Sequence, residues 1–151
     1  MSRLVTKEGL DKLKQEFDER TTQTRQEIAK SIKEAKEQGD LSENAEYSSA
    51  KERQTENETR IAELEVMIKD AQVVEKNKDD DSAQIGSKVT AKSKNKEFVF
   101  EIVGSNEANP AERKISNESP IGKALIGSNV GDAVEVETPG GVVKYTIESI
   151  S

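Results

Sequence analysis

The stretch 39-GDLSENAEY-47 decides the fold of the N-terminal half of this chain. Before it, from Thr6 to Gln38, apolar residues recur at steps of three, four and seven, the spacing of an amphipathic helix, and Thr6 is a suitable N-cap. Gly39 interrupts this pattern, and a second helical pattern runs from Asp40 to about Glu75. The sequence therefore predicts two long helices of matched length, joined at the quoted stretch.

The short connection at Gly39 favours an antiparallel coiled-coil pair, and about 32 residues per helix give a rod of about 48 Å. A heptad seam is expected along the second helix at Ile61, Leu64, Ile68 and Ala71. Several positions assigned to the middle of the seam are polar, so we expect modest stability; these are Thr21, Thr24, Ser49, Thr55 and Thr59.

The C-terminal half has a different period. Strands are predicted at 88–91, 97–103, 114–116, 133–138 and 142–150, because apolar and polar residues alternate in several of these segments, and a tight turn is predicted at 138–141. A short helix is expected after Ser119 as N-cap, with Pro120 at its first position and Gly127 beyond its end. The predicted fold class is α+β: a coiled coil at 1–76, a linker at 77–84 and an α+β domain at 85–151.

The composition excludes several kinds of chemistry. The 151 residues include no cysteine and no histidine, which excludes disulfides, thiolate sites, catalytic triads and imidazole metal ligands. A net charge of −7 argues against a general basic surface for nucleic acid. Because the chain has neither a long apolar run nor the apolar core of a signal peptide, we expect a soluble, cytoplasmic protein with no membrane contact.

The quoted stretch is acidic, and two interpretations stay open. Between Lys36 and Lys51 the charged residues are all acids, namely Glu37, Asp40, Glu43 and Glu46. In the structural interpretation Asp40 caps the second helix and Glu43 lies at position N3 of a capping box. In the functional interpretation the carboxylates of Asp40 and Glu43 bind one divalent cation, as half of a site, because Mg²⁺ prefers six oxygens.

Several motifs occur together and in order: the quoted stretch, SAKERQ, ISNESPIGKALIG, VGD and TPGG. In this combination the whole chain resembles the bacterial transcript-cleavage factors of the Gre family. The resemblance implies that the coiled coil enters the secondary channel of RNA polymerase, while an FKBP-like C-terminal domain contacts the coiled coil at the channel rim. It also implies that a monomer stimulates the polymerase's own cleavage of backtracked nascent RNA near its 3′ end.

The resemblance assigns the central role to Asp40 and Glu43, which would share a Mg²⁺ ion with the polymerase active site and help to orient the attacking water in a two-metal hydrolysis. The protein would then be no enzyme itself, and alone it would bind no Mg²⁺ tightly. Ser42 and Asn44 either position water or RNA phosphates or serve as first-turn residues. Tyr47 either stacks on a displaced base or packs the end of the hairpin.

Two further contact regions follow from the resemblance. Lys51, Arg53 and Arg60 are candidates for a basic patch along the coiled coil that contacts extruded RNA. A solvated face with pairs such as Glu56 with Arg60 is the other interpretation of the same charges. Glu118, Ser119, Pro120 and Ile121 match the segment that contacts the polymerase, and no prolyl isomerase activity is implied.

Two rival functions stay open. One is a regulator that occupies the secondary channel without stimulating cleavage, and the other is a coiled-coil adaptor with a small β domain. The intact pair Asp40 and Glu43 favours the cleavage factor over both.

Overall fold

The computed structural model describes residues 3–40 and 43–151, and the chain divides into two compact units. The hairpin unit is Asp11–Asp70, and the sheet unit is Met1–Leu10 together with Ala71–Ser151. This division differs from a coiled coil at 1–76, because the residues that flank the hairpin form short strands of the sheet unit.

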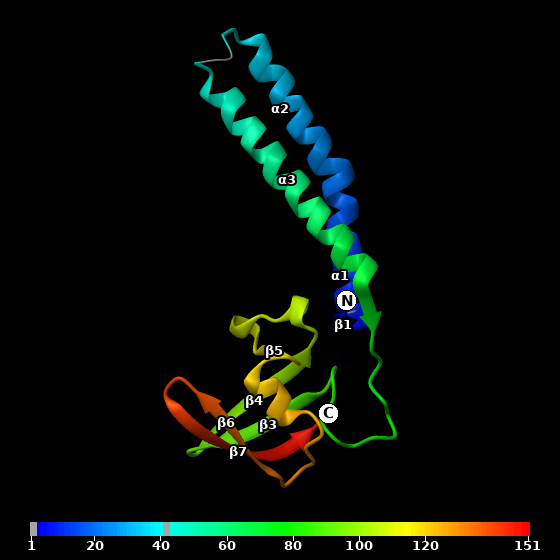
Figure 1. The fold of residues 1–151 in the computed structure, drawn as a ribbon, viewed down its shortest axis with the longest axis vertical. Coiled ribbons are helices and arrows are strands. Elements are labelled where there is room, and N and C mark those ends of the chain that lie inside the picture. Colours follow the sequence, from blue (N-terminus) through cyan, green and yellow to red (C-terminus); the bar gives the residue numbers. More distant parts are fainter. Residues whose placement is uncertain (1–2, 41–42) are drawn as a thin grey trace. The chain divides into compact units, whose positions relative to one another are not determined.

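The hairpin contains two antiparallel helical arms (Figure 1). The first arm is α1 (Lys7–Glu19), a π-helical turn η1 (Arg20–Thr24) and α2 (Arg25–Glu37), which run on without a break. The second arm is α3 (Ala45–Asp70). The first predicted helix is confirmed, whereas the predicted bounds of the second are wrong at both ends.

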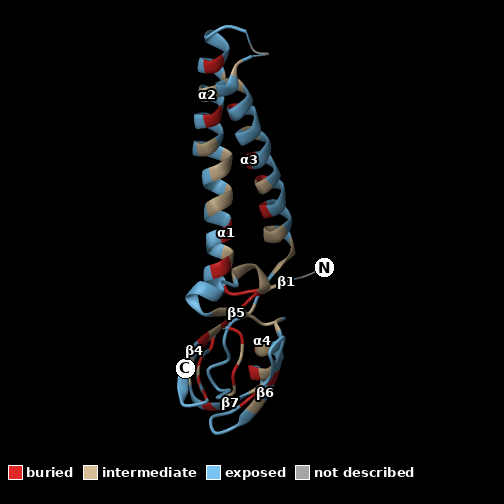
Figure 2. Ribbon diagram, turned by 90° about the vertical axis from the view of Figure 1, so that its left-hand side faces the viewer, coloured by how far each residue is buried: buried red, intermediate tan, exposed pale blue. Residues whose placement is uncertain are grey.

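The seam of the hairpin is thin. Its buried residues recur along the helices (Figure 2) and are Leu13, Ile28 and Ala35 on the first arm and Ala50, Asn57, Ile61 and Leu64 on the second. The seam is confirmed at Ile61 and Leu64, but Ser49, Thr55 and Thr59 are exposed. The heptad phase runs through Ala50, Asn57 and Leu64, so the buried polar residue of α3 is Asn57.

The sheet unit contains a five-stranded sheet in the order β5-β4-β3-β7-β6. The strands are β3 (Lys88–Ser93), β4 (Lys96–Val103), β5 (Lys114–Ser116), β6 (Ala133–Thr138) and β7 (Gly141–Ile150). All pairs are antiparallel except β4 with β5. The five predicted strands and the tight turn between Thr138 and Gly141 are confirmed, as is the α+β fold class.

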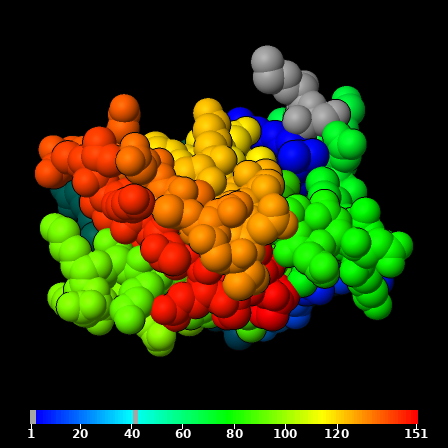
Figure 3. Space-filling view, turned by 90° about the horizontal axis from the view of Figure 1, so that it is seen from below, coloured from blue at the N-terminus to red at the C-terminus, as the bar shows by residue number. Residues whose placement is uncertain are grey.

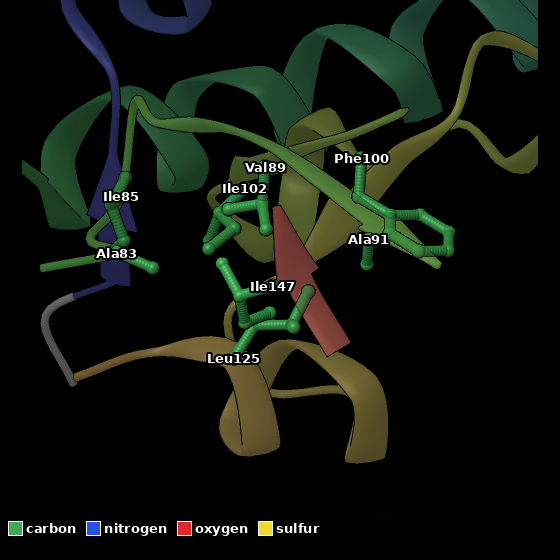
Figure 4. Packing of buried hydrophobic residues seen from close by; sticks show 8 residues of the cluster. All are labelled: Ala83, Ile85, Val89, Ala91, Phe100, Ile102, Leu125 and Ile147. Atoms are coloured by element: carbon green, nitrogen blue, oxygen red, sulfur yellow. The ribbon is translucent and has the colours of Figure 1, made fainter. Parts of the chain in front are cut away.

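One helix, α4 (Pro120–Leu125), packs on this sheet. Its Leu125 lies close to Ile147 of β7 in the buried cluster of Figure 4, which also includes Val89, Ala91, Phe100 and Ile102. The predicted cap is confirmed, because the Ser119 hydroxyl accepts the N–H of Gly122 at 3.1 Å. Glycine is required at 122, since a Cβ there would lie 1.9 Å from the Ser116 carbonyl oxygen.

A second, two-stranded parallel sheet was not expected from the sequence. It pairs β1 (Arg3–Val5) with β2 (Ala71–Val73), so the chain after Asp70 is extended where the helical pattern predicts helix. Two 3₁₀ turns, η2 (Ser105–Glu107) and η3 (Pro110–Glu112), complete the sheet unit. Within the described residues, no helix is both long and apolar enough to cross a membrane.

The start of α1 depends on η2. The Glu107 carboxylate accepts the backbone N–H of Thr6 at 2.9 Å and that of Gly104 at 3.1 Å, and it also accepts the Thr6 hydroxyl. The Thr6 oxygen in turn accepts the N–H of Gly9 at 3.0 Å. Thr6 is therefore the N-cap of α1, as predicted, and Glu107 holds that cap in place.

Candidate functional site at the hairpin turn

The hairpin reverses direction just after α2. The N–H of Gln38 bonds to the Ala35 carbonyl at 3.2 Å, and Gly39 follows with a φ of +121°, a conformation that favours glycine. The motif then continues to Asn44, immediately before α3. Leu41 and Ser42 lie outside the described residues, so the predicted role of Ser42 stays a prediction.

Asn44 joins the two arms at the turn. Its side-chain oxygen accepts the N–H of Tyr47 at 3.0 Å, and its side-chain nitrogen donates to the Ala35 carbonyl at 2.7 Å. The predicted cap at Asp40 is therefore wrong, because α3 begins at Ala45 and its cap is Asn44. An amide serves here better than a carboxylate, since only the amide has both an acceptor and a donor.

Asp40 and Glu43 are both exposed at this turn. Since Asn44 is the helix cap, the predicted capping box does not account for the two acids. Their carboxylate oxygens are hard donors that suit Mg²⁺, but two side chains supply only part of its six ligands. In residues 3–40 and 43–151, no group of three or more acidic side chains is arranged to hold a metal ion. The two carboxylates suit Mg²⁺ as donors, and they fill only part of its coordination.

A shallow groove lies between the arms close to the turn. Its volume is about 400 Å³, and its lining is Ser31, Glu34, Ala35, Gln38, Ala45, Glu46, Ser49, Ala50 and Arg53. Arg53 is exposed, and so is Lys51, whose ammonium donates to the side chain of Gln54 at 2.8 Å. Tyr47 is half-buried in the first turn of α3. Lys51 and Arg53 thus place two exposed positive charges within about three helical turns of Glu43.

Arg60 is held differently from Lys51 and Arg53. Its guanidinium donates to both carboxylate oxygens of Glu16, each at 2.9 Å, and to Glu63 at 3.4 Å. Its main partner is thus on the opposite arm, in place of the Glu56 that the spacing suggests. Of the three residues of the candidate basic patch, Lys51 and Arg53 are exposed, whereas the guanidinium of Arg60 is paired with Glu16 of the opposite arm.

A polar network crosses the seam around Arg60. We define the seam network as Glu16, Arg20, Asn57 and Arg60. Arg20 donates to Glu16 at 2.7 Å and to the Asn57 side-chain oxygen at 3.1 Å. Hydrogen bonds from Arg60, and then from Arg20, lower the pKa of the Glu16 carboxyl from 4.5 to about 2. Sequence reasoning missed this network, although the heptad spacing of Asn57 from Ala50 and Leu64 was a usable signal.

The candidate rim segment is only partly exposed. Glu118 and Pro120 are exposed, Ser119 serves as the cap of α4, and Ile121 is half-buried against the core. The role of Ile121 in contacting a partner stays a prediction, and more exposed apolar residues follow α4. These are Ile126 and Val130, with exposed fractions of 39% and 60%.

A larger hollow in the sheet unit has a volume of about 650 Å³. Its lining comes from three segments, residues 76–81, residues 129–130 and Ile150. Green, orange and red parts of the chain meet on the face shown in Figure 3. Lysine and aspartate side chains of both signs line the hollow, so it has no preference for one sign of ligand charge. The turn with Asp40 and Glu43 remains the better functional candidate.

Two family models together cover almost the whole chain. A model described as "Transcription elongation factor, N-terminal" matches residues 3–73, and one described as "Transcription elongation factor, GreA/GreB, C-term" matches residues 77–151. The chain belongs to the GreA/GreB family of transcription elongation factors. The resemblance drawn from the sequence motifs is confirmed.

Curated relatives point to the GreA type within this family. The chain is 49% identical over 150 residues to transcription elongation factor GreA of Acetivibrio thermocellus, covering 97% of this chain and 94% of that one. It is 48% identical to GreA of Clostridium acetobutylicum, covering 97% and 95%. Among solved structures, GreA factor homolog 1 (Gfh1) of Thermus thermophilus is 29% identical, covers 100% of this chain and 99% of that one, and gives a TM-score of 0.47.

Proposed function

We propose that this elongation factor inserts its hairpin turn into the secondary channel of a bacterial RNA polymerase and stimulates the polymerase's own cleavage of backtracked RNA. The observation that carries the proposal is the exposure of Asp40 and Glu43 at a turn whose helix cap is Asn44. Carboxylate oxygens exposed at a turn are suited to a hard cation such as Mg²⁺. The factor acts in the cytoplasm, as a monomer, and is not itself a nuclease.

Each part of the chain has a role in this proposal. Asp40 and Glu43 supply carboxylate oxygens, and Asn44 fixes the chain between them and α3. A Mg²⁺ ion shared with the polymerase would supply positive charge to the phosphodiester and lower the pKa of a bound water. Lys51 and Arg53 offer positive charge to RNA phosphates. Ser42 and Tyr47 remain candidates for contacts with water or a displaced base.

The sheet unit would hold the factor at the channel rim. Glu118, Ser119 and Pro120 form a segment fixed by a proline and a helix cap, and a rigid segment loses little entropy when it binds. Ile126 and Val130 add exposed apolar surface to the same region of the chain. We therefore extend the proposed rim contact to these two residues.

The test uses backtracked elongation complexes with labelled RNA. Asp40→Asn and Glu43→Gln should each lower the rate of cleavage by roughly 100-fold, the usual effect of losing a transition-state charge contact. Glu46→Gln is the matched control, because Glu46 is an exposed acid one position into α3, and it should cleave at the parent rate. Binding to polymerase is measured in parallel and should not change.

Other outcomes would replace the proposal. If both variants cleave like the parent, the carboxylates are not involved. If the parent binds polymerase and changes elongation without any cleavage, the non-cleaving channel regulator is the function. Calorimetry on the protein alone should give no micromolar Mg²⁺ site, and finding one would contradict a shared ion.

A further inference from the structure

A buried asparagine, Asn57, lies in the middle of the hairpin. The Asn57 side chain is only 3% exposed, in a seam position that is otherwise apolar on α3. Its nitrogen donates to the Arg20 carbonyl at 3.1 Å, and its oxygen accepts from the Arg20 guanidinium at 3.1 Å. Both ends of one amide are thus satisfied by one residue of the opposite arm.

That residue begins the π-helical turn η1. A π turn is wider than an α turn, because its backbone hydrogen bonds join residues five positions apart in place of four. Here side chains reach three of them: Thr21 donates to the Phe17 carbonyl at 2.9 Å, Thr22 to that of Asp18 at 2.7 Å, and Asn57 to that of Arg20. Asn57 therefore binds a backbone carbonyl at the start of the π turn, and its contact depends on the conformation of that turn.

Two ion pairs reinforce the same crossing point. Glu16 accepts from Arg20 on its own arm and from Arg60 on α3. All three side chains are about one-third exposed, so each pair is weak as an isolated stabilising contact. Their geometry is nevertheless specific, because Arg60 binds both carboxylate oxygens of Glu16.

Other registers of the two arms would lose these contacts. The seam residues Ala50, Ile61 and Leu64 have no group that could bond the Arg20 carbonyl. Gln54 has an amide, but on a longer side chain that already accepts from Lys51. A slipped hairpin would therefore bury polar groups of Arg20 without partners, which is costly. A polar residue in an apolar seam is known to fix register in this way.

We propose that the seam network is a register lock that sets the position of Asp40 and Glu43 at the hairpin turn, with Asn57 as a positioning residue. A slip of one helical turn would move α3 along α2 by about 5 Å and change how many residues remain in the turn. The effect on cleavage rests on the proposed function, whereas the effect on register does not.

Register can be measured directly, because the chain contains no cysteine. Spin labels on Lys30→Cys and Glu65→Cys, both at exposed positions of the hairpin, report the offset between the arms by pulsed electron resonance. The parent should give one narrow distance. Asn57→Leu should give a broadened or second distance, shifted by about 5 Å, the rise of one turn. Thr59→Leu, at an exposed position of α3, should leave the distance unchanged.

A second variant guards against misfolding. Asn57→Asp keeps the shape and the acceptor for Arg20 but loses the donor to the Arg20 carbonyl, so it should also broaden the distance. The cleavage rate with both Asn57 variants should fall roughly 10- to 100-fold, as expected when reacting groups are misplaced. The melting temperature of Asn57→Leu should stay near that of the parent or rise, because an apolar residue replaces a buried polar one. A purely structural role would instead lower the melting temperature and leave the distance narrow.

The two readouts separate the two proposals. A narrow, unshifted distance in both Asn57 variants overturns the register lock, whatever happens to cleavage. A parent protein that cleaves nothing overturns the proposed function, and the distances still decide the lock. Broadened distances with unchanged cleavage would show that register does not position the acids, and would overturn the positioning role.

Discussion

An amide side chain can accept one hydrogen bond and donate another, and Asn44 uses both to join α2 to α3. Asn44→Ala should therefore lower the free energy of unfolding of the hairpin by about 1–2 kcal/mol. Asn44→Asp should cost less, because it keeps the cap and loses only the donor to Ala35. Urea unfolding followed by helical circular dichroism gives both values.

The control for this prediction is Ser48→Ala, at an exposed position in the first turns of α3. Since Ser48 does not cap the helix, its replacement should change the free energy of unfolding by less than the change at Asn44. An equal or larger loss at Ser48 would contradict the description of Asn44 as the cap.

At the same scale, Glu16 gives the hairpin a specific pH dependence. Its pKa of about 2 lies below the ordinary 4.5, so its contribution is complete above about pH 4.5 and is lost as the pH falls toward 2. With the side chain 32% exposed, solvent screening limits the loss to about 1–2 kcal/mol. The difference in stability between the parent and Glu16→Gln, measured from pH 6 to pH 2, should shrink across this window. A difference that stays constant would contradict the ion pairs.

At the scale of elements, the start of α1 depends on a residue from a distant 3₁₀ turn. Glu107→Ala removes acceptors for two backbone N–H groups and the Thr6 hydroxyl, and should lower the free energy of unfolding by about 1–3 kcal/mol. Hydrogen exchange should quicken at Thr6 and Gly104 in particular. Glu137→Ala, at an exposed site on β6, is the control and should change neither.

The elements also show what sequence can and cannot predict. The order of apolar and polar residues predicted the five strands well, and the Ser119 cap was readable from local chemistry. The C-terminal end of α3 could not be predicted from the sequence. The helical pattern continues past Asp70, but residues 71–73 are extended because they pair with β1. β2 has three residues and continues the helical pattern of α3, so it could not be recognised without its partner β1.

At the scale of the whole molecule, the motif order was enough to place the chain in its family and to identify the acids at the turn. The heptad spacing of Asn57 was a readable signal, but the contacts of the seam network were not predicted, because they depend on a π turn in the first arm that no residue pattern indicates. The same limit applies to Arg60, whose partner Glu16 is 44 residues away. Local spacing suggested Glu56 only because a sequence reveals near neighbours more readily than distant ones.

The hydrogen bond between Thr6 and Glu107 also constrains the order of folding during synthesis. The two residues are 101 positions apart, so Glu107 cannot hold the Thr6 cap until more than two-thirds of the protein has been made. The hairpin, whose contacts lie within residues 11–70, can form well before then. The first turn of α1 lacks its acceptor on Glu107 until η2 is made, whereas the partner of β1, strand β2 at Ala71–Val73, is synthesised earlier.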